Sequence, residues 1–258
     1  MIIRKSPEEI EKMAAAGRVV VDTIALIGEN LRPGVTTGEL DRIAADYIAS
    51  QGGTSPFFGY RGYPASICTS PNDMVVHGIP GEVRLDEGDT LSVDVGVTLN
   101  GFVADSAYTF AVGEASPDAQ RLLEACQAAL EAGIAQIRPG NRLSDISHAI
   151  QTTTEEAGYS VVRSLVGHGI GRSMHEDPQI PNYGDPGRGP ELAPGMTFAV
   201  EPMITAGGPE VVVHDDEWSI STADGSLSAH FEHTVAVTDD GPRILTAAER
   251  PVGAGLLP

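Results

Sequence analysis

The feature that most constrains the fold of this chain is an internal repeat. The first half contains LRPGVTTGEL, starting at Leu31, and the second half contains IRPGNRLSDI, starting at Ile137, an offset of 106. Further along, GDTLSVD from Gly88 matches GMTFAVE from Gly195 at an offset of 107. Two copies are too few for a solenoid, but they suit two half-domains packed about a pseudo-twofold axis. We therefore predict a single domain over residues 1–258, with internal halves at about 6–113 and 116–247.

Each half is predicted to begin with two helices separated by an Arg-Pro-Gly stop, followed by strands. Residue pairs typical of a helix start precede three of these helices: Ser6 with Glu9, Thr36 with Glu39, and Ser116 with Pro117. Short strands are expected at 65–69 and 161–166, in addition to the strands that the repeat shares.

A β-hairpin with one acid on each strand closes the first half. Two alternating, β-branched runs within residues 88–112 meet at Asn100-Gly101, the commonest two-residue hairpin turn. Facing residue numbers then sum to 201, and Asp94 and Asp105 lie on one face as diagonal neighbours, with Cβ atoms roughly 7 Å apart or less. Two carboxylates aimed at one point inside apolar strands need a compensating charge, so a metal ion is the leading hypothesis.

The repeat supplies a second pair of acids. Glu201 stands at the repeat position of Asp94, and Glu232 lies on the next core strand. Their separation is 31 residues, against 11 in the first half, which leaves room for an extra hairpin around Trp218. The two pairs are expected to face each other across the axis, between the halves, where ligand clefts are common.

Histidine adds a nitrogen ligand to these oxygens. His168 lies between glycines in GHGIG, which would let its imidazole approach another group closely. One nitrogen among carboxylates favours manganese, iron(II) or cobalt over a cysteine-rich zinc site. Five ligands exceed the needs of one ion and suit two ions with shared carboxylates, which would activate a water and polarise a carbonyl. His77 and His175 are weaker candidates on spacing alone.

Bulk properties exclude several classes of protein. The formal charge of -20 opposes phosphate backbones, so no direct nucleic-acid partner is expected. No apolar run is long enough to span a membrane, and the N-terminus lacks the apolar core of a signal peptide. Two cysteines in unrelated contexts make a disulfide framework improbable and favour the cytoplasm.

Taken together, SVDVGVTLNGFVADSAYTF, GHGIG, FAVEPM and FEHTVAV resemble the type I methionine aminopeptidases. The resemblance runs from about Pro7 to Leu245. It implies the α+β pita-bread fold, with an antiparallel sheet core, helices outside and two pseudo-twofold-related halves. It also implies a catalytic domain that removes the initiator methionine from nascent polypeptides whose second residue is small. The attacking group would be a water or hydroxide bridging two metals.

The resemblance implies a role for each matching residue. Asp94 would bind one metal, Asp105 and Glu232 would bridge both, and His168 and Glu201 would complete the second. Glu201 would also act as general acid and base, His77 would contact the substrate near the scissile nitrogen, and His175 would stabilise the oxyanion. The side chains implied for the methionine pocket are Phe57, Tyr60, Tyr63, Cys68, Met174 and Trp218.

Further expectations concern ions and partners. The metals would be cobalt, manganese or iron(II), with zinc as a further candidate, and a sodium or potassium ion would lie near Asn72, the Met74 backbone and Ser228. Met174 and Arg61 depart from residues common in the family. Because Ile2 is bulky, the protein should keep its own initiator methionine. We expect a monomer that contacts the ribosome transiently.

Two rival functions stay open on sequence alone. The first is a proline-specific aminopeptidase or dipeptidase of the same fold. The second is a fold relative without metals that binds peptides and catalyses nothing; such a protein should have lost ligands, and all five are present here.

Overall fold

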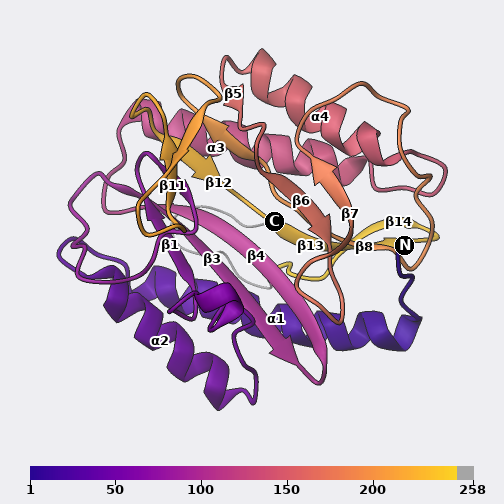
Figure 1. Cartoon of the computed structure of the whole chain (residues 1–258), viewed down its shortest axis with the longest axis horizontal. Coiled ribbons are helices and arrows are strands. Elements are labelled where there is room, and N and C mark those ends of the chain that lie inside the picture. The colour runs from indigo at the N-terminus through magenta and orange to yellow at the C-terminus, as the bar shows by residue number, and fades with distance from the viewer. Residues whose placement is uncertain (249–258) are drawn as a thin grey trace.

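The computed structural model describes residues 1–248, which form two helix pairs and a set of antiparallel sheets (Figure 1). The helices are α1 (Pro7–Asn30), α2 (Thr37–Ser50), α3 (Pro117–Ala135) and α4 (Leu143–Glu156), with a short 3-10 turn at Tyr60–Gly62. The strands are β1 (Cys68–Pro71), β2 (Met74–Val76), β3 (Thr90–Leu99), β4 (Phe102–Ala111), β5 (Ser160–Val161), β6 (Val166–Gly169), β7 (Glu176–Pro181), β8 (Thr197–Val200), β9 (Met203–Thr205), β10 (Val211–Val213), β11 (Ile220–Thr222), β12 (Ser228–His230), β13 (His233–Thr238) and β14 (Gly241–Ile244).

The helices begin at the predicted caps. Ser6 and Thr36 each accept a backbone N–H from the residue three positions on, and the glutamate there bonds back to complete the capping box. Ser116 caps α3 by accepting from Ala119. Each cap satisfies backbone donors that a helix start leaves free, so the starts could be identified from the sequence.

The hairpin of β3 and β4 has the predicted register. Leu99 faces Phe102, and every facing pair along the ten residues sums to 201. Asn100 and Gly101 both have positive φ angles, 51° and 79°, as the predicted tight turn requires. A turn with two positive φ angles twists in the same sense as the two strands that it joins, so it holds the register of the whole hairpin.

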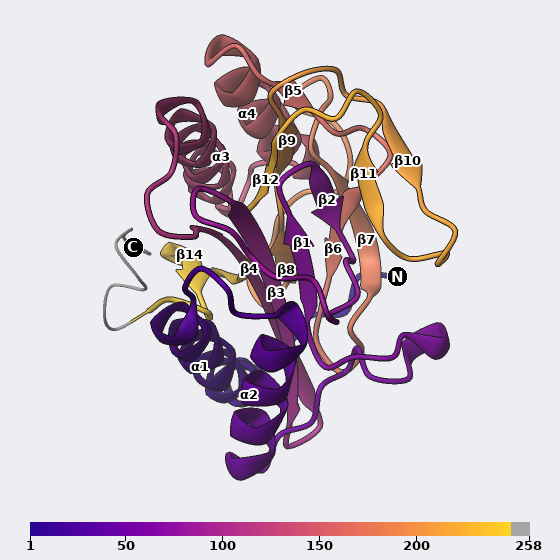
Figure 2. The same cartoon turned by 90° about the vertical axis from the view of Figure 1, so that its left-hand side faces the viewer.

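The repeat extends to the backbone hydrogen bonds at the start of each second helix. In the first half, Gly34 N donates to Leu85 O (2.7 Å) and Leu85 N donates to Val35 O (3.0 Å). In the second half, the bonds at the repeat positions are Gly140 N to Leu192 O (3.3 Å) and Leu192 N to Asn141 O (2.8 Å). Figure 2 shows the two helix pairs on one side of the strands, α1 and α2 at one end and α3 and α4 at the other.

The two largest sheets meet at the centre of the molecule. One has the order β1-β3-β4 and the other β14-β13-β8-β6-β7, all pairs antiparallel. The main chain of Asp105 on β4 donates to and accepts from Thr234 Oγ1 on β13, at 2.9 and 2.8 Å. Glu232 N donates to Ala107 O (2.9 Å), so the halves are joined next to their acidic residues. Two smaller sheets, β10-β11-β2 and β12-β9-β5, lie in the longer connection of the second half and around it.

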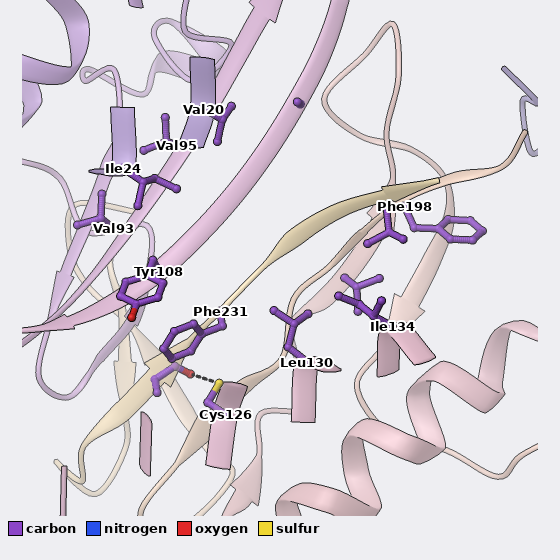
Figure 3. Close-up of a cluster of buried hydrophobic side chains, with 14 of the residues drawn as sticks. Val20, Ile24, Val93, Val95, Tyr108, Cys126, Leu130, Ile134, Phe198 and Phe231 are labelled. Carbon is purple, nitrogen blue, oxygen red and sulfur yellow. Dashed lines mark hydrogen bonds between the residues drawn. The ribbon is translucent and has the colours of Figure 1, made fainter. Parts of the chain in front are cut away.

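One continuous core runs through both halves. Val20 and Ile24 of α1 pack toward β3, while Leu130 and Ile134 of α3 lie toward Phe198 of β8 (Figure 3). The core closes over Cys126, whose thiol donates to the carbonyls of Pro202 and Ala229, both at 3.4 Å. Apolar burial on this scale, roughly 25 cal/mol per Å², ties the two halves together.

Two predicted strands differ from the structure. The run 161–166 is not one strand: β5 ends at Val161 and β6 begins at Val166. The two pieces pair in different sheets, β5 with β9 and β6 with β7 and β8, so the chain must turn between them. The strand expected at 65–69 is shifted to Cys68–Pro71, where it pairs with β3. Among the described residues, no helix combines the length and apolar character needed to cross a bilayer.

Candidate active site and metal centre

All thirteen residues predicted for the site lie around one cavity of about 750 Å³ between the halves. They come from distant parts of the chain and from both sheets: Phe57, Tyr60, Tyr63, Cys68, His77, Asp94, Asp105, His168, Met174, His175, Glu201, Trp218 and Glu232. The structure therefore brings together the whole set that the sequence analysis predicted.

Asp94 and Asp105 reach the cavity from adjacent strands. Asp105 faces Gly96 on β3, so its carboxylate lies diagonally across from that of Asp94, as the register predicts. On the other edge of β3, Asp94 faces Cys68 of β1. Gly96 lies on the same face as the two acids, and the absence of a side chain there leaves space that the Phe57 ring fills; a Cβ at Gly96 would lie 2.9 Å from this ring.

Glu201 and Glu232 reach the same cavity from the ends of two paired strands. Val200, the last residue of β8, faces His233, the first residue of β13. Glu201 follows β8 and Glu232 precedes β13, so both acids stand just outside the paired region. Leaving the ladder here frees the main chain to turn both carboxylates toward the first-half pair.

His168 is held on β6 by close strand packing. Its Nδ1 lies 2.9 Å from Gly169 O, and its Nε2 lies 3.4 Å from Glu201 Oε1. A Cβ at Gly167 would lie 2.5 Å from Ala199 O of β8, and one at Gly169 would lie 2.1 Å from Asp177 O of β7. These glycines let two neighbouring backbones approach β6.

The cluster is electrostatically unfavourable as a set of bare side chains. Burial raises the pKa of Asp94 to about 7, and a hydrogen bond with Asp105 partly opposes this shift. Burial, with Glu232 and Asp94 nearby, raises the pKa of Asp105 well above its ordinary range. Burial and neighbouring carboxylates likewise raise the pKa values of Glu201 and Glu232. Burial lowers the pKa of His168 to about 4, so this ring is neutral near pH 7. A neutral imidazole has a lone pair to give to a metal.

Residues of this cluster fit a divalent metal centre. Ligand atoms of Asp105, His168 and Glu232 all lie within 4.8 Å of one another, and all three residues are buried. Asp94 Oδ1, Asp105 Oδ1 and Glu232 Oε1 are buried without a hydrogen-bond partner. Unsatisfied buried carboxylate oxygens are costly, and a cation at their centre removes both the repulsion and the missing contacts.

His77 and His175 both line the cavity. His77 follows β2 with a φ of 60°, a conformation that non-glycine residues adopt only at a cost of about 1 kcal/mol or more. Its ring lies 6.3 Å from that of Trp218, edge to face. The His175 ring lies 4.4 Å from His168 and 5.5 Å from Tyr60. Burial lowers the pKa of both rings, that of His77 to about 4.

An apolar wall adjoins the acidic cluster. Phe57, Tyr63 and Cys68 form a buried cluster against which Met174 and Trp218 pack. Tyr63 donates its hydroxyl to Ile67 O (3.0 Å) or Gly78 O (2.9 Å), and its ring lies 5.0 Å from Trp218, edge to face. Tyr60 is 37% exposed and lies at the rim. These side chains leave an apolar recess beside the carboxylates.

The three positions expected near a monovalent cation also converge. Ser228 Oγ lies 3.2 Å from Asn72 O and 3.0 Å from Met74 O. The main-chain carbonyls of Asn72 and Met74 and the hydroxyl of Ser228 therefore lie together at the start of β2, the strand that precedes His77.

Sequence reasoning missed His230, a buried residue of the cavity. Its Nε2 lies 3.7 Å from Glu201 Oε2 and has no hydrogen-bond partner. Burial lowers its pKa to about 3, with a further contribution from His77. Because His230 stands two positions before Glu232, strand alternation could have placed both on one face. Gln179 and Glu217 also line the cavity without having been predicted.

The chain is similar to known proteins over most of its length. The sequence profile described as metallopeptidase family M24 matches residues 11–239. Methionine aminopeptidase from Clostridium acetobutylicum is 51% identical over 250 residues, which cover 96% of this chain and 100% of that protein. Methionine aminopeptidase 1 from Bacillus subtilis is 50% identical over 246 residues, or 95% of this chain and 99% of that protein.

Solved structures give the same result for the fold. The crystal structure of methionine aminopeptidase from Rickettsia prowazekii matches with a TM-score of 0.94 at 42% identity, covering 95% of this chain and 100% of that one. The predicted pita-bread architecture, with an antiparallel core and outer helices, is confirmed.

Proposed function

Because the chain belongs to the metallopeptidase family M24, we propose that it removes the N-terminal methionine from new polypeptides whose second residue is small. One observation carries this proposal: a buried carboxylate and histidine cluster shares a single cavity with an apolar recess. The cluster suits hydrolysis of an amide, and the recess suits one unbranched apolar side chain. Their adjacency would present a terminal methionyl bond to the cluster.

Two divalent cations would be held by Asp94, Asp105, His168, Glu201 and Glu232. Manganese, iron(II) and cobalt fit this mixture of oxygens and one nitrogen, and zinc would fit as well. Ions bound there would activate a water as the nucleophile and polarise the scissile carbonyl. The unsatisfied oxygens of three of these residues support the assignment.

Glu201 would move the proton. Its two carboxylate oxygens lie 3.4 Å from His168 Nε2 and 3.7 Å from His230 Nε2, and the residue lines the cavity. It would accept a proton from the attacking water and pass it to the leaving amine.

The two histidines at the cavity wall would act on the substrate amide. His77 would contact the scissile nitrogen, and His175 would donate to the oxyanion that develops on the carbonyl oxygen. Both rings have lowered pKa values because they are buried, so they would act as neutral donors.

Substrate selection would depend on two features. The free α-amine of the peptide would sit among the carboxylates, and an internal bond brings no amine. The methionine side chain would enter the recess formed by Phe57, Tyr60, Tyr63, Cys68, Met174 and Trp218, where size discrimination is worth roughly 1–3 kcal/mol per methylene. Because the second residue of a substrate must be small, this protein would keep its own Met1, which precedes the bulky Ile2.

Other parts of the proposal concern surroundings. Sodium or potassium would bind at the carbonyls of Asn72 and Met74 beside Ser228, because these oxygens already converge. The chain would work as a monomer in the cytoplasm on polypeptides leaving the ribosome, with transient ribosome contact and no direct nucleic-acid or membrane partner. Two unpaired, buried cysteines and the charge of -20 support this setting.

The decisive experiment compares two tripeptides. Protein stripped of metal should be inactive, and anaerobic addition of Mn(II), Fe(II) or Co(II) should restore turnover of Met-Ala-Ser but not of Ala-Pro-Ala. Preference for Ala-Pro-Ala would identify a proline-directed peptidase instead. Inactivity with all three metals would support a peptide-binding protein without catalysis.

A further inference from the structure

A buried ion pair outside the cavity joins the N-terminal segment to the loop that carries His175. Lys5 Nζ lies 2.5 Å from Glu176 Oε2, and the two side chains are 3% and 7% exposed. Lys5 Nζ also donates to Ile3 O at 3.2 Å. Neither residue lines the cavity, and neither takes part in the chemistry proposed above.

The other carboxylate oxygen of Glu176 organises the loop. Glu176 Oε1 accepts the backbone N–H groups of Arg172 (2.8 Å) and Ser173 (3.3 Å). These two residues directly precede Met174 and His175, which face the cavity. Glu176 therefore fixes the main chain on one side of His175 through charge-assisted hydrogen bonds, which are roughly twice as strong as neutral ones.

Neighbouring backbone is shaped to admit the lysine. A Cβ at Gly171 would lie 2.2 Å from Lys5 Cε, and a Cβ at Gly195 would lie 2.7 Å from Lys5 O. The main chain holds the same segment, because Lys5 N donates to Gly195 O at 2.7 Å. The last glycine of GHGIG thus makes room for the ion pair, as the first two make room for strands.

Stability alone is a weak reason for such a pair. Removing two charges from water costs several kcal/mol per ion, and apolar replacements of buried pairs are often neutral or stabilising. The pair does, however, select one conformation of the 171–175 loop, together with the Arg172–Glu9 ion pair (2.8 Å) and the hydrogen bond from Val103 N to Gly171 O (2.7 Å). Rates of enzymes are sensitive to such placement, since a shift of ~1 Å can cost ~100-fold.

We infer that Glu176 is a positioning residue that holds the 171–175 loop so that His175 meets the scissile carbonyl, and that Lys5 supplies the counter-charge for the buried Glu176 carboxylate. This inference rests on the proposed role of His175. It adds that the N-terminal segment, although remote from the substrate, is part of the catalytic architecture.

The test uses volume-matched substitutions in two backgrounds. K5M/E176M removes both charges and the loop acceptor, whereas K5M/E176Q keeps an oxygen that can accept from Arg172 and Ser173. Each double substitution is made in the wild-type background and in the H175A background. K12M is the control, because Lys12 forms an exposed pair with Glu8 at 2.8 Å. Readouts are kcat and KM on Met-Ala-Ser, thermal stability, and Mn(II) affinity of the apo-protein.

K5M/E176M should lower kcat by about 10- to 100-fold, with KM and Mn(II) affinity nearly unchanged. K5M/E176Q should recover most of kcat, and K12M should match the wild type. In H175A, K5M/E176M should cost almost nothing further, since groups that act through one another are not additive. A purely structural pair would lower activity in both backgrounds.

Two results separate the possible failures. Wild-type turnover by H175A would overturn the proposed role of His175 and with it this inference. If H175A turns over slowly, the positioning role alone would be overturned by a K5M/E176M variant that is harmless in the wild-type background, or by one whose loss of kcat is fully additive to that of H175A. If K5M/E176M does not fold, E176D takes its place: the shorter side chain keeps the charge but withdraws from the loop, and kcat should fall with the same non-additivity.

Discussion

The two acid pairs of the repeat are built differently. In the first half, Asp94 and Asp105 lie within continuous ten-residue strands joined by a two-residue turn. In the second half, Glu201 and Glu232 stand just beyond the paired ends of β8 and β13, and β9 to β12 lie between them in the chain. Both arrangements aim carboxylates at one point, but only the second is interrupted.

This difference separates two tasks. The symmetric part of the repeat supplies carboxylates from both sides of the axis, which is what a shared metal pair needs. The asymmetric insertion supplies Trp218 and His230, which both line the cavity. We expect metal binding to depend equally on both halves and substrate preference to depend mainly on the insertion.

The largest expected effect comes from neutralising one acid in each half. D105N and E232Q should each lower kcat/KM by more than about 100-fold, since even outer partners of a metal site can be worth 10- to 100-fold. In metal-free protein, the same variants should be more stable than the wild type by about 1 kcal/mol or more, because each removes a buried, repelled carboxylate. Tripeptide assays and urea unfolding with chelator at pH 8 check both parts. Loss in only one half would break the symmetry of the comparison.

The stability of the metal-free wild type should depend on pH. The folded pKa of Asp94, about 7, lies above its ordinary value of 3.8 because the group is buried. A raised folded pKa stabilises the protein fully below about pH 4 and loses that contribution as the pH rises through 7. The free energy of unfolding of the apo-protein should therefore fall between these values, by more than that of D94N. Added Mn(II) should remove the fall at the high end; a flat profile for both proteins would contradict this.

Substitution of Trp218 tests whether the asymmetric insertion determines substrate preference. W218A should lower kcat/KM for Met-Ala-Ser by about 10- to 100-fold, because an aromatic side chain that closes the recess is lost. Mn(II) affinity should stay unchanged, since the Trp218 ring lies beside Tyr63 and His77, and the carboxylate that accepts from its main chain belongs to Asp216, which is not a proposed ligand. Calorimetric Mn(II) titration of the variant provides the control. A large loss of Mn(II) affinity would mean that Trp218 contributes to the metal centre as well as to substrate binding.

The smallest effect is expected at the turn of the first hairpin. G101A should destabilise the protein by about 1 kcal/mol, because Gly101 has a φ of 79° that alanine adopts poorly. The matched control is G81A, where the backbone is ordinary and a Cβ would meet nothing within 4 Å. Turnover should be unchanged in both variants, because the register is also held by the packing of α1 against β3 and β4. A change in kcat for G101A would show that the turn transmits strain to Asp94 and Asp105.

Local signals predicted most of the elements. Capping boxes, the Asn100-Gly101 turn and strand alternation each act within a few residues, so helix starts and the register of β3 and β4 could be derived directly. The 161–166 run was misjudged for a corresponding reason. Apolar composition indicates burial, but it does not say that Val161 and Val166 pair in different sheets.

The sequence by itself determined that Asp94 and Asp105 share a face, because alternation and a two-residue turn leave one register. It also determined that Glu201 is the counterpart of Asp94, because the repeated segments GDTLSVD and GMTFAVE align these two residues. Tertiary structure alone decided how these pairs meet. The bonds between β4 and the start of β13, the positive φ of His77, the burial of His230 and the path of Lys5 to Glu176 all depend on contacts between residues far apart in the chain. Local sequence propensities contain no information about such contacts, because these interactions form only when the two halves pack together.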